Sequence, residues 1–280
     1  MTDQNGTQDA EDRTRDLFGR HRALVGMVHV GALPGTPKGA LTIDQLIINA
    51  ARDGALLAEA GFDALLVENM HDLPYLRRNV GPEIVAGMTV IARALRETLD
   101  LPMGIQVLAG ANREALAVAQ AADCGFIRAE GFAYASVADE GLLEEADAGP
   151  LLRYRRAIGA DGIRVLADVR KKHSAHAITS DVPLDEQVRT AEFMGAEAVV
   201  VTGSATGRSV DRQELEQAAA ASTLPTIVGS GACRETVAEL LDTADAVIVG
   251  SAAKLDARWH RGVDPGRAAG IVEAARSRHP

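Results

Sequence analysis

The chain is poor in aromatic residues, cysteine and lysine, and each shortage narrows what the protein can be. Only 3% of its 280 residues are aromatic while 47% are hydrophobic, so a core has to be built mainly from Ala, Val, Leu and Ile. Its two cysteines, Cys124 and Cys233, have no spacing that suits zinc, and we expect two free, buried thiols. The net charge of −10 argues against a nucleic-acid-binding protein, because such proteins present a basic face.

Long apolar stretches are also missing. No run approaches the roughly 20 residues that a membrane-spanning helix needs, so no transmembrane segment is expected. Residues 1–20 are polar and charged and lack the apolar centre of a signal peptide. We therefore predict a flexible polar tail over residues 1–20, one domain over residues 21–280, and a cytoplasmic location.

A recurring junction organises the rest of the chain. A helical segment ends in Gly or another small residue, an acidic residue or Gly follows, and then comes a short apolar run, as in Ala60-Gly61-Phe62-Asp63 before residues 64–67. These runs are continuous rather than alternating, which is typical of parallel strands covered on both faces. The predicted strands are residues 24–30, 64–67, 102–108, 126–127, 163–167, 198–201, 225–228 and 246–249.

Helical patterns separate these runs. In residues 43–61, for example, apolar or small residues recur at the spacing of one helical face. Eight alternating strand and helix units in about 250 residues predict an α/β protein with a single (β/α)₈ barrel. The rival is a doubly wound open sheet, in which a Gly-rich turn often follows the first strand and opens a helix. Here residues 31–39 contain Pro34 and Pro37, which indicate a loop instead.

Residues at the carboxyl ends of barrel strands face the active site. Glu68 and Asp168 end apolar runs, so they are expected in a partly desolvated mouth where the pKa of a carboxyl group can rise towards neutrality. They are the predicted general acid and base. The alternative is that each caps a loop or pairs with Arg128 or a lysine.

Lys172 and His173 follow Asp168 closely and complete the predicted catalytic set. Lys172 could form a Schiff base or hold an anion as a cation, and His173 could transfer a proton. The chain has only four lysines, so two neighbouring ones in a mouth loop favour a function over a solvated basic loop, which is the alternative.

Small residues end the last strands, where backbone N–H groups can approach an anion, and barrels often bind phosphate there. The alternative is that these glycines only form tight turns. The predicted phosphate-binding residues are Gly203, Gly229, Ser230, Gly231, Gly250 and Ser251, and the predicted substrate-binding residues are His29, Asn69, Arg128, Glu130 and Thr202. No cofactor is expected; a divalent metal held by His29 with Glu68 or Asp168 is the less favoured alternative.

Several separated motifs resemble the BtpA/SgcQ family, which is named after a photosystem I biogenesis protein and a protein of a sugar-related gene region. The resemblance implies a ribulose-phosphate-binding type of barrel and supports a phosphate site, but it supplies no reaction. The chain has Ser251 at a position where Thr is common in the family. Either residue offers a hydroxyl and a backbone N–H to a phosphate. The motifs are Gly26-Met27-Val28-His29 with Leu33-Pro34-Gly35, residues 67–75, residues 128–132, Ala167-Asp168-Val169 with Lys172-His173, Val201-Thr202-Gly203, Gly229-Ser230-Gly231 and Val249-Gly250-Ser251.

Three functions fit these features. The leading one is an enzyme that acts on a phosphorylated sugar or related metabolite, with isomerase or lyase chemistry favoured and C–N glycosidic cleavage also open. The second is a non-catalytic assembly or regulatory factor, to which so many converging charges at strand ends would be of no use. The third is a metal-dependent hydrolase that uses His29, Glu68, Asp168 and His173. The expected partner is a small phosphorylated substrate, and a homo-oligomer is left open.

Overall fold

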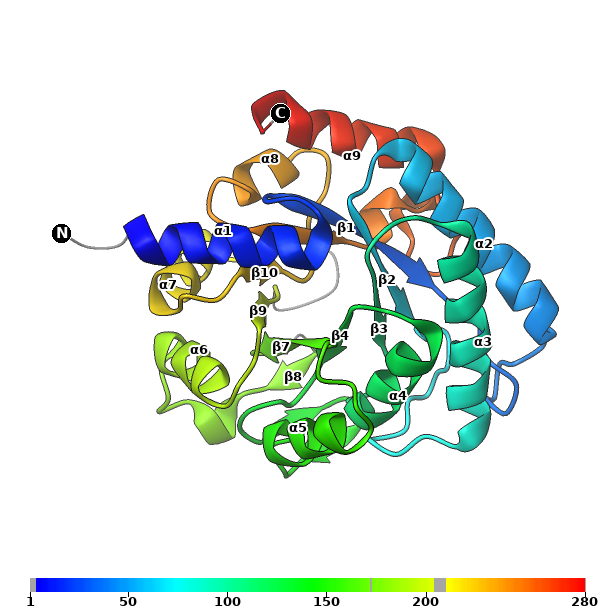
Figure 1. The fold of residues 1–280 in the computed structure, drawn as a ribbon, viewed down its shortest axis with the longest axis horizontal. Coiled ribbons are helices and arrows are strands. Elements are labelled where there is room, and N and C mark those ends of the chain that lie inside the picture. Colours follow the sequence, from blue (N-terminus) through cyan, green and yellow to red (C-terminus); the bar gives the residue numbers. More distant parts are fainter. Residues whose placement is uncertain (1–3, 172, 204–209, 280) are drawn as a thin grey trace.

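The computed structural model describes residues 4–171, 173–203 and 210–279, and among them eight parallel strands close into a barrel (Figure 1). Neighbouring strands follow the order β1-β11-β10-β9-β7-β4-β3-β2 around it. The predicted barrel is confirmed, and each predicted run overlaps one strand. The barrel strands are β1 (Ala23–His29), β2 (Ala64–Glu68), β3 (Met103–Gln106), β4 (Phe126–Ala129), β7 (Arg164–Val169), β9 (Ala198–Val201), β10 (Thr226–Val228) and β11 (Ala246–Val249).

Helices cover the outside of the barrel (Figure 1). Local sequence sets their ends: α2 begins at a capping box in which Thr42 and Gln45 bond each other's backbone N–H, and it ends at Gly61 with φ +95°. The surrounding helices are α2 (Ile43–Ala60), α3 (Pro82–Thr98), α4 (Asn112–Ala122), α5 (Ala148–Ala157), α6 (Leu184–Phe193), α7 (Arg212–Ala221), α8 (Val237–Leu240) and α9 (Pro265–Arg278), with short 3₁₀ turns η1 (Ala177–Thr179), η2 (Ser251–Ala253) and η3 (Leu255–Ala257). No described helix is long and apolar enough to cross a membrane.

The prediction of a flexible tail over residues 1–20 is wrong for Gln4–Phe18, which form helix α1. The helix lies across the amino-terminal end of the barrel, and its last residues, Leu17 and Phe18, are buried there. The ring of Phe18 meets the ring of Phe126 edge-on at 5.3 Å. Gly104 makes room for Phe126, because a Cβ at this glycine would lie 2.1 Å from the ring. A composition-based prediction missed these two anchoring residues.

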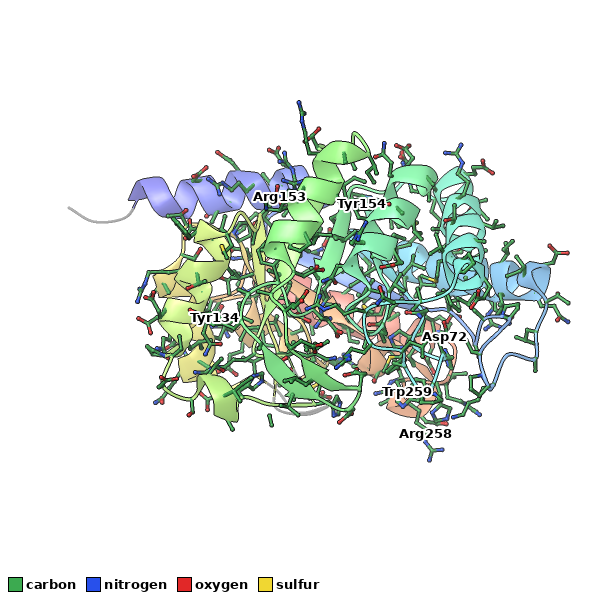
Figure 2. The ribbon with its side chains drawn as sticks, turned by 90° about the horizontal axis from the view of Figure 1, so that it is seen from below. Asp72, Tyr134, Arg153, Tyr154, Arg258 and Trp259 are labelled. Carbon is green, nitrogen blue, oxygen red and sulfur yellow. The ribbon has the colours of Figure 1, made fainter. Side chains whose placement is uncertain are left out.

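A small antiparallel sheet, which the sequence did not predict, lies at the opposite end. It consists of β5 (Ser136–Ala138), β6 (Gly141–Leu143) and β8 (Ser174–Ala175), in the order β6-β5-β8. In Figure 2 this sheet and Trp259 lie on one side of the molecule and α1 on the other. The sheet therefore stands beside the carboxyl ends of the barrel strands, where a barrel places its site.

Both cysteines are free, as predicted; Cys124 is buried, whereas Cys233 is half-buried rather than buried. Burial raises the pKa of the Cys124 thiol to about 12, so this group stays protonated at neutral pH.

Candidate functional site

Two adjoining cavities lie at the carboxyl ends of the strands. One, of about 230 Å³, is lined by Gly229–Gly231 and by Gly250 and Ser251; we refer to it as the glycine-lined cavity. The other, of about 260 Å³, is lined by the carboxylates Glu68, Glu130, Asp139 and Glu140 and is the carboxylate-lined cavity. Glu68, Met70 and Arg128 line both. A ligand beside these three residues would contact both cavities.

Close packing explains the glycine at the end of β10. A Cβ at Gly229 would lie 2.5 Å from Val200 and 3.0 Å from the guanidinium of Arg128. Gly231 has φ +81°, a conformation that favours glycine. The guanidinium of Arg267, on α9, also lines this cavity, while its Nε donates to the carbonyl of Ala252 at 2.8 Å. The cavity therefore combines close backbone access with an exposed cation.

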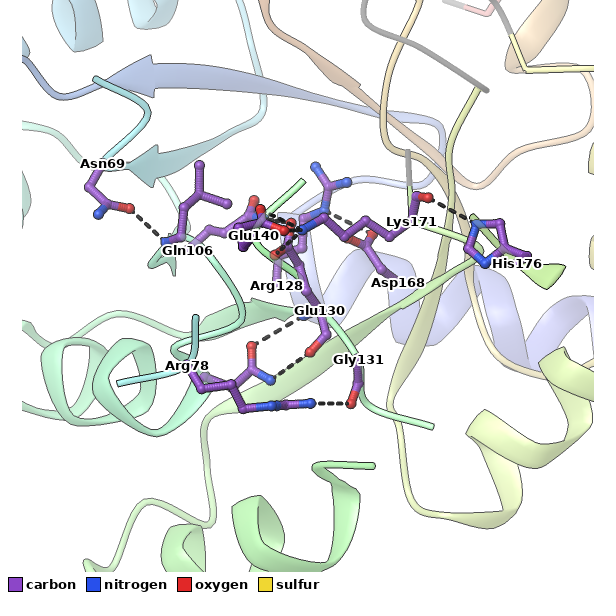
Figure 3. Close-up of polar contacts among 12 residues, drawn as sticks. Asn69, Arg78, Gln106, Arg128, Glu130, Gly131, Glu140, Asp168, Lys171 and His176 are labelled. Carbon is purple, nitrogen blue, oxygen red and sulfur yellow. Dashed lines mark hydrogen bonds and ion pairs between the residues drawn. The ribbon is translucent and has the colours of Figure 1, made fainter. Parts of the chain in front are cut away.

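Arg128 and Asp168 form a buried ion pair across β4 and β7 (Figure 3). Arg128 Nε donates to Asp168 Oδ1 at 3.0 Å, and the two side chains are 4% and 0% exposed. Burial opposes the charge of Arg128, but the neighbouring Asp168, Glu68 and Glu130 outweigh it and raise the pKa of the guanidinium. Arg128 lines both cavities, whereas Asp168 is not among their lining residues. Asp168 is thus held against Arg128, and the catalytic role predicted for Asp168 stays a prediction.

Lys171 joins two carboxylates on the other side of the mouth (Figure 3). Its Nζ lies 3.1 Å from Glu130 Oε2 and 3.0 Å from Glu140 Oε1. Burial disfavours the charge of Lys171, yet these two carboxylates outweigh it and raise the pKa of the ammonium group. For Glu130 burial dominates, and the pKa of its carboxyl group is raised in spite of Lys171. Glu140 belongs to the turn between β5 and β6, so the small sheet completes the cavity.

Glu130 should make folding stability depend on pH. Because the pKa of its carboxyl group is raised above the ordinary 4.5, the folded state holds a proton that the unfolded state has lost. Stability should therefore fall as the pH rises from 4.5 through the raised pKa, by up to about 1.4 kcal/mol per pH unit for one proton. Urea unfolding at a series of pH values measures this slope, and we expect Glu130→Gln to flatten it. The exposed Glu97→Gln is the control, and equal slopes in both variants would contradict the assignment.

His29 and Glu68 stand side by side at the ends of β1 and β2. His29 Nε2 lies 3.7 Å from Glu68 Oε2, and His29 Nδ1 lies 2.8 Å from the carbonyl oxygen of Trp259. Because a carbonyl only accepts hydrogen bonds, Nδ1 carries a proton, and Nε2 is the nitrogen that faces Glu68. The pair can hold or transfer a proton in the glycine-lined cavity, which both residues line.

Other predicted site residues have structural partners. Asn69 Oδ1 accepts from the N–H of Leu108 at 2.7 Å, and its amide donates to Asp72 at 2.9 Å. The Thr202 hydroxyl donates to the carbonyl of Arg170 at 3.1 Å. The N–H of Gly203 donates to Ser230 Oγ at 3.2 Å, which positions Ser230. Their substrate and phosphate contacts stay predictions.

Lys172 and His173 were both predicted to be catalytic, and the structure describes only one of them. His173 lines the carboxylate-lined cavity, while Lys172 lies outside the described residues. Among the described residues no group of three or more His, Cys, Asp and Glu side chains is arranged to hold a metal ion.

Sequence reasoning missed several lining residues, among them Glu140, Arg267 and Tyr75. Glu140 follows no barrel strand, and Arg267 lies on α9, far along the chain. Tyr75 lines the carboxylate-lined cavity and donates its hydroxyl to the carbonyl of Met70 at 2.7 Å. Burial, with the nearby carboxylates, raises the pKa of Tyr75, so its hydroxyl stays protonated. Of Glu140, Arg267 and Tyr75, only Tyr75 could have been found from the sequence, because it belongs to the family motif of residues 67–75.

A family model described as the BtpA family matches residues 20–277. The chain belongs to the BtpA family. A mitochondrial protein of Caenorhabditis elegans described as uncharacterised is 42% identical over 257 residues, covering 90% of this chain and 92% of that protein. The photosystem I biogenesis protein BtpA of Synechocystis is 33% identical over 258 residues, covering 92% of this chain and 89% of that protein. The family resemblance seen in the sequence is thereby confirmed.

Solved structures with the same fold are much more distant in sequence. Thiamine phosphate pyrophosphorylase from Pyrococcus furiosus superposes with a TM-score of 0.58 at 13% identity, covering 92% of this chain and 98% of that chain. N-(5′-phosphoribosyl)anthranilate isomerase from Pyrococcus furiosus gives 0.55 at 14% identity, covering 92% of this chain and 100% of that chain. At such identities the likeness shows the barrel fold alone.

Proposed function

We propose that this BtpA-family barrel is an enzyme that acts on a phosphorylated sugar or a related phosphorylated metabolite. The observation that carries the proposal is that Glu68 and Arg128 line both the glycine-lined and the carboxylate-lined cavity. The phosphate lies against the backbone of Gly229–Gly231 and Gly250–Ser251, with Arg267 beside it. The reacting carbon atoms lie where the two cavities meet.

The favoured chemistry is proton transfer in an isomerase or lyase reaction. Glu68 removes a proton from carbon next to a carbonyl group, and Arg128 stabilises the negative charge that develops on the oxygen. His29 returns or relays the proton through Nε2. Lys171 is a poor candidate for a Schiff base, because its raised pKa keeps it protonated, and it supplies positive charge instead.

A thermal-shift comparison of sugar phosphates with their unphosphorylated counterparts tests the phosphate site. A ligand at 100 times its dissociation constant stabilises the folded state by about 2.7 kcal/mol, which corresponds to a rise in Tm of several degrees. We expect this rise only with phosphorylated compounds, and a smaller rise in Arg267→Gln. Arg153→Gln, an exposed arginine on α5, is the matched control. If phosphorylated and unphosphorylated compounds shift Tm equally, the phosphate site is wrong.

A second candidate function rests on the relative named a photosystem I biogenesis protein. If this chain were a non-catalytic assembly factor, loss of the mouth carboxylates would leave its role intact. The buried Arg128–Asp168 pair and the Lys171 bridge favour the enzyme, since a scaffold gains nothing from desolvated charges at the mouth. A cytoplasmic location stays a prediction.

A further inference from the structure

A third and larger cavity lies outside the barrel mouth, between α2 and the loop of residues 259–262. Its volume is about 620 Å³, within the range of sites for small molecules and cofactors. It shares only wall residues with the two mouth cavities: His29 with the glycine-lined cavity, and Leu73 and Trp259 with the carboxylate-lined one. We refer to it as the outer cavity. The proposed function makes no use of it.

The outer cavity has an excess of positive charge in a chain whose net charge is −10. Lys38, Arg52 and Arg261 line it, and Asp53 is the only acidic residue among the described lining residues. Asp53 is already engaged, because its Oδ2 lies 3.4 Å from the buried Nζ of Lys254 and its Oδ1 accepts from the N–H of Val263 at 3.2 Å. Asp53 Oδ1 also lies 3.4 Å from Nη2 of the exposed Arg52, so this one carboxylate is shared between Lys254 and Arg52. The lining cations therefore still outnumber the lining carboxylate and can attract an anion.

Arg52 lies beside the loop that carries Arg261. The guanidinium of Arg52 lies against Gly262, since a Cβ at that glycine would be 2.9 Å from Arg52 Nη2, and Arg261 is the adjoining residue. Arg261 reaches a carboxylate only at 4.0 Å, that of Asp256, where both side chains are more than half exposed. Such an exposed pair contributes little and competes weakly with an incoming anion.

The wall beside these cations is aromatic. The ring of Trp259 lies 5.1 Å from that of His71, tilted by 47°, and 5.5 Å from that of His260, edge-on. His71 Nδ1 lies 2.7 Å from the carbonyl oxygen of Val30, so Nδ1 donates to that carbonyl and Nε2 can accept a hydrogen bond from a ligand. Flat rings stack on such a wall, and cations beside it select a negative charge.

We propose that the outer cavity is a second ligand site, which binds a planar anion of nucleoside monophosphate size. The base stacks on Trp259, and the phosphate lies among Lys38, Arg52 and Arg261. The backbone carbonyl of Trp259 also accepts from His29 Nδ1 at 2.8 Å, so an occupant of this site touches the residue that orients His29. The site thereby adjoins the mouth without being part of it.

Titration with AMP tests this site directly, because Trp259 is the only tryptophan of the chain and its fluorescence reports contact with the ring. We expect saturable quenching by AMP, weaker quenching by adenosine, and none by inorganic phosphate. Replacing both Lys38 and Arg52 by glutamine should weaken AMP binding about tenfold or more, or at least 1.4 kcal/mol. Both side chains are exposed, and an unchanged Tm relative to Arg153→Gln shows that the double variant folds.

Arg267→Gln separates the outer cavity from the glycine-lined cavity, because Arg267 lines the latter and not the former. AMP affinity should be the same in this variant as in the unaltered protein. The proposal is overturned if millimolar AMP gives no saturable change. It is also overturned if Arg267→Gln weakens AMP binding while the Lys38 and Arg52 double variant does not. Neither outcome bears on the sugar-phosphate screen, so the two proposals can fail independently.

Discussion

Replacement of Arg128 by methionine should lower the free energy of unfolding by about 3–5 kcal/mol, the cost of breaking a buried ion pair from one side. The loss follows from what the guanidinium faces. It bonds Asp168 at 3.0 Å, and Glu68 and Glu130 are close enough to raise its pKa. Without Arg128, the carboxylates of Asp168, Glu68 and Glu130 lose the positive charge that they share, which destabilises the folded state. Urea unfolding at neutral pH measures the loss.

The two partners of the ion pair should not contribute equally to the free energy of unfolding. Asp168→Asn should cost less than Arg128→Met, because Glu68 and Glu130 still balance part of the arginine charge in that variant. Lowering the pH should narrow the gap between Arg128→Met and the unaltered protein, since protonation relieves the carboxylates. Arg153→Met, on the exposed face of α5, should stay within about 0.5 kcal/mol of the unaltered protein. If Arg128→Met lowers the free energy of unfolding no more than Arg153→Met does, the buried ion pair does not stabilise the fold.

The barrel could be predicted because each strand carries its own signal. A parallel strand covered on both faces is a continuous apolar run, and a helix that packs on it ends at a residue such as Gly61, which adopts φ +95°. Helix α1 has no such signal, since its sequence is mostly polar and charged, and its buried residues Ala10, Thr14, Leu17 and Phe18 include only two large apolar side chains. The β5–β6–β8 sheet was not predicted for a similar reason: its strands are two or three residues long, too short to show a hydrophobic pattern.

The candidate site could be predicted as a place but not as a set of contacts. The rule that strand ends face the mouth found Glu68, Arg128 and Glu130, and all of them line the cavities. The same rule could not show which carboxylate is free to react, because that depends on ion pairs with side chains from other parts of the chain. Asp168 is held by Arg128, forty positions away, and Glu130 by Lys171. Arg267 reaches the mouth only through the path of α9.

Replacement of Glu68 by glutamine should reduce turnover of a phosphorylated substrate about 10²–10⁴-fold, the usual contribution of a general acid or base. Glutamine keeps the shape of the side chain but cannot take up a proton, so ligand binding should be retained. The thermal shift given by the same sugar phosphate should therefore stay close to that of the unaltered protein. The two readouts together separate lost chemistry from a damaged site.

The outcome also decides between the enzyme and the assembly factor. Glu59→Gln, an exposed carboxylate on α2, is the matched control and should leave both turnover and the thermal shift unchanged. Glu140→Gln removes one of the two carboxylates that hold Lys171, so it should alter turnover less than Glu68→Gln. If Glu68→Gln keeps full turnover, Glu68 is not the base. If no phosphorylated compound is turned over and Glu68→Gln leaves the cellular role intact, the non-catalytic function is favoured. The position of Glu68, beside His29 at 3.7 Å and on the wall of both cavities, is the reason to expect the opposite.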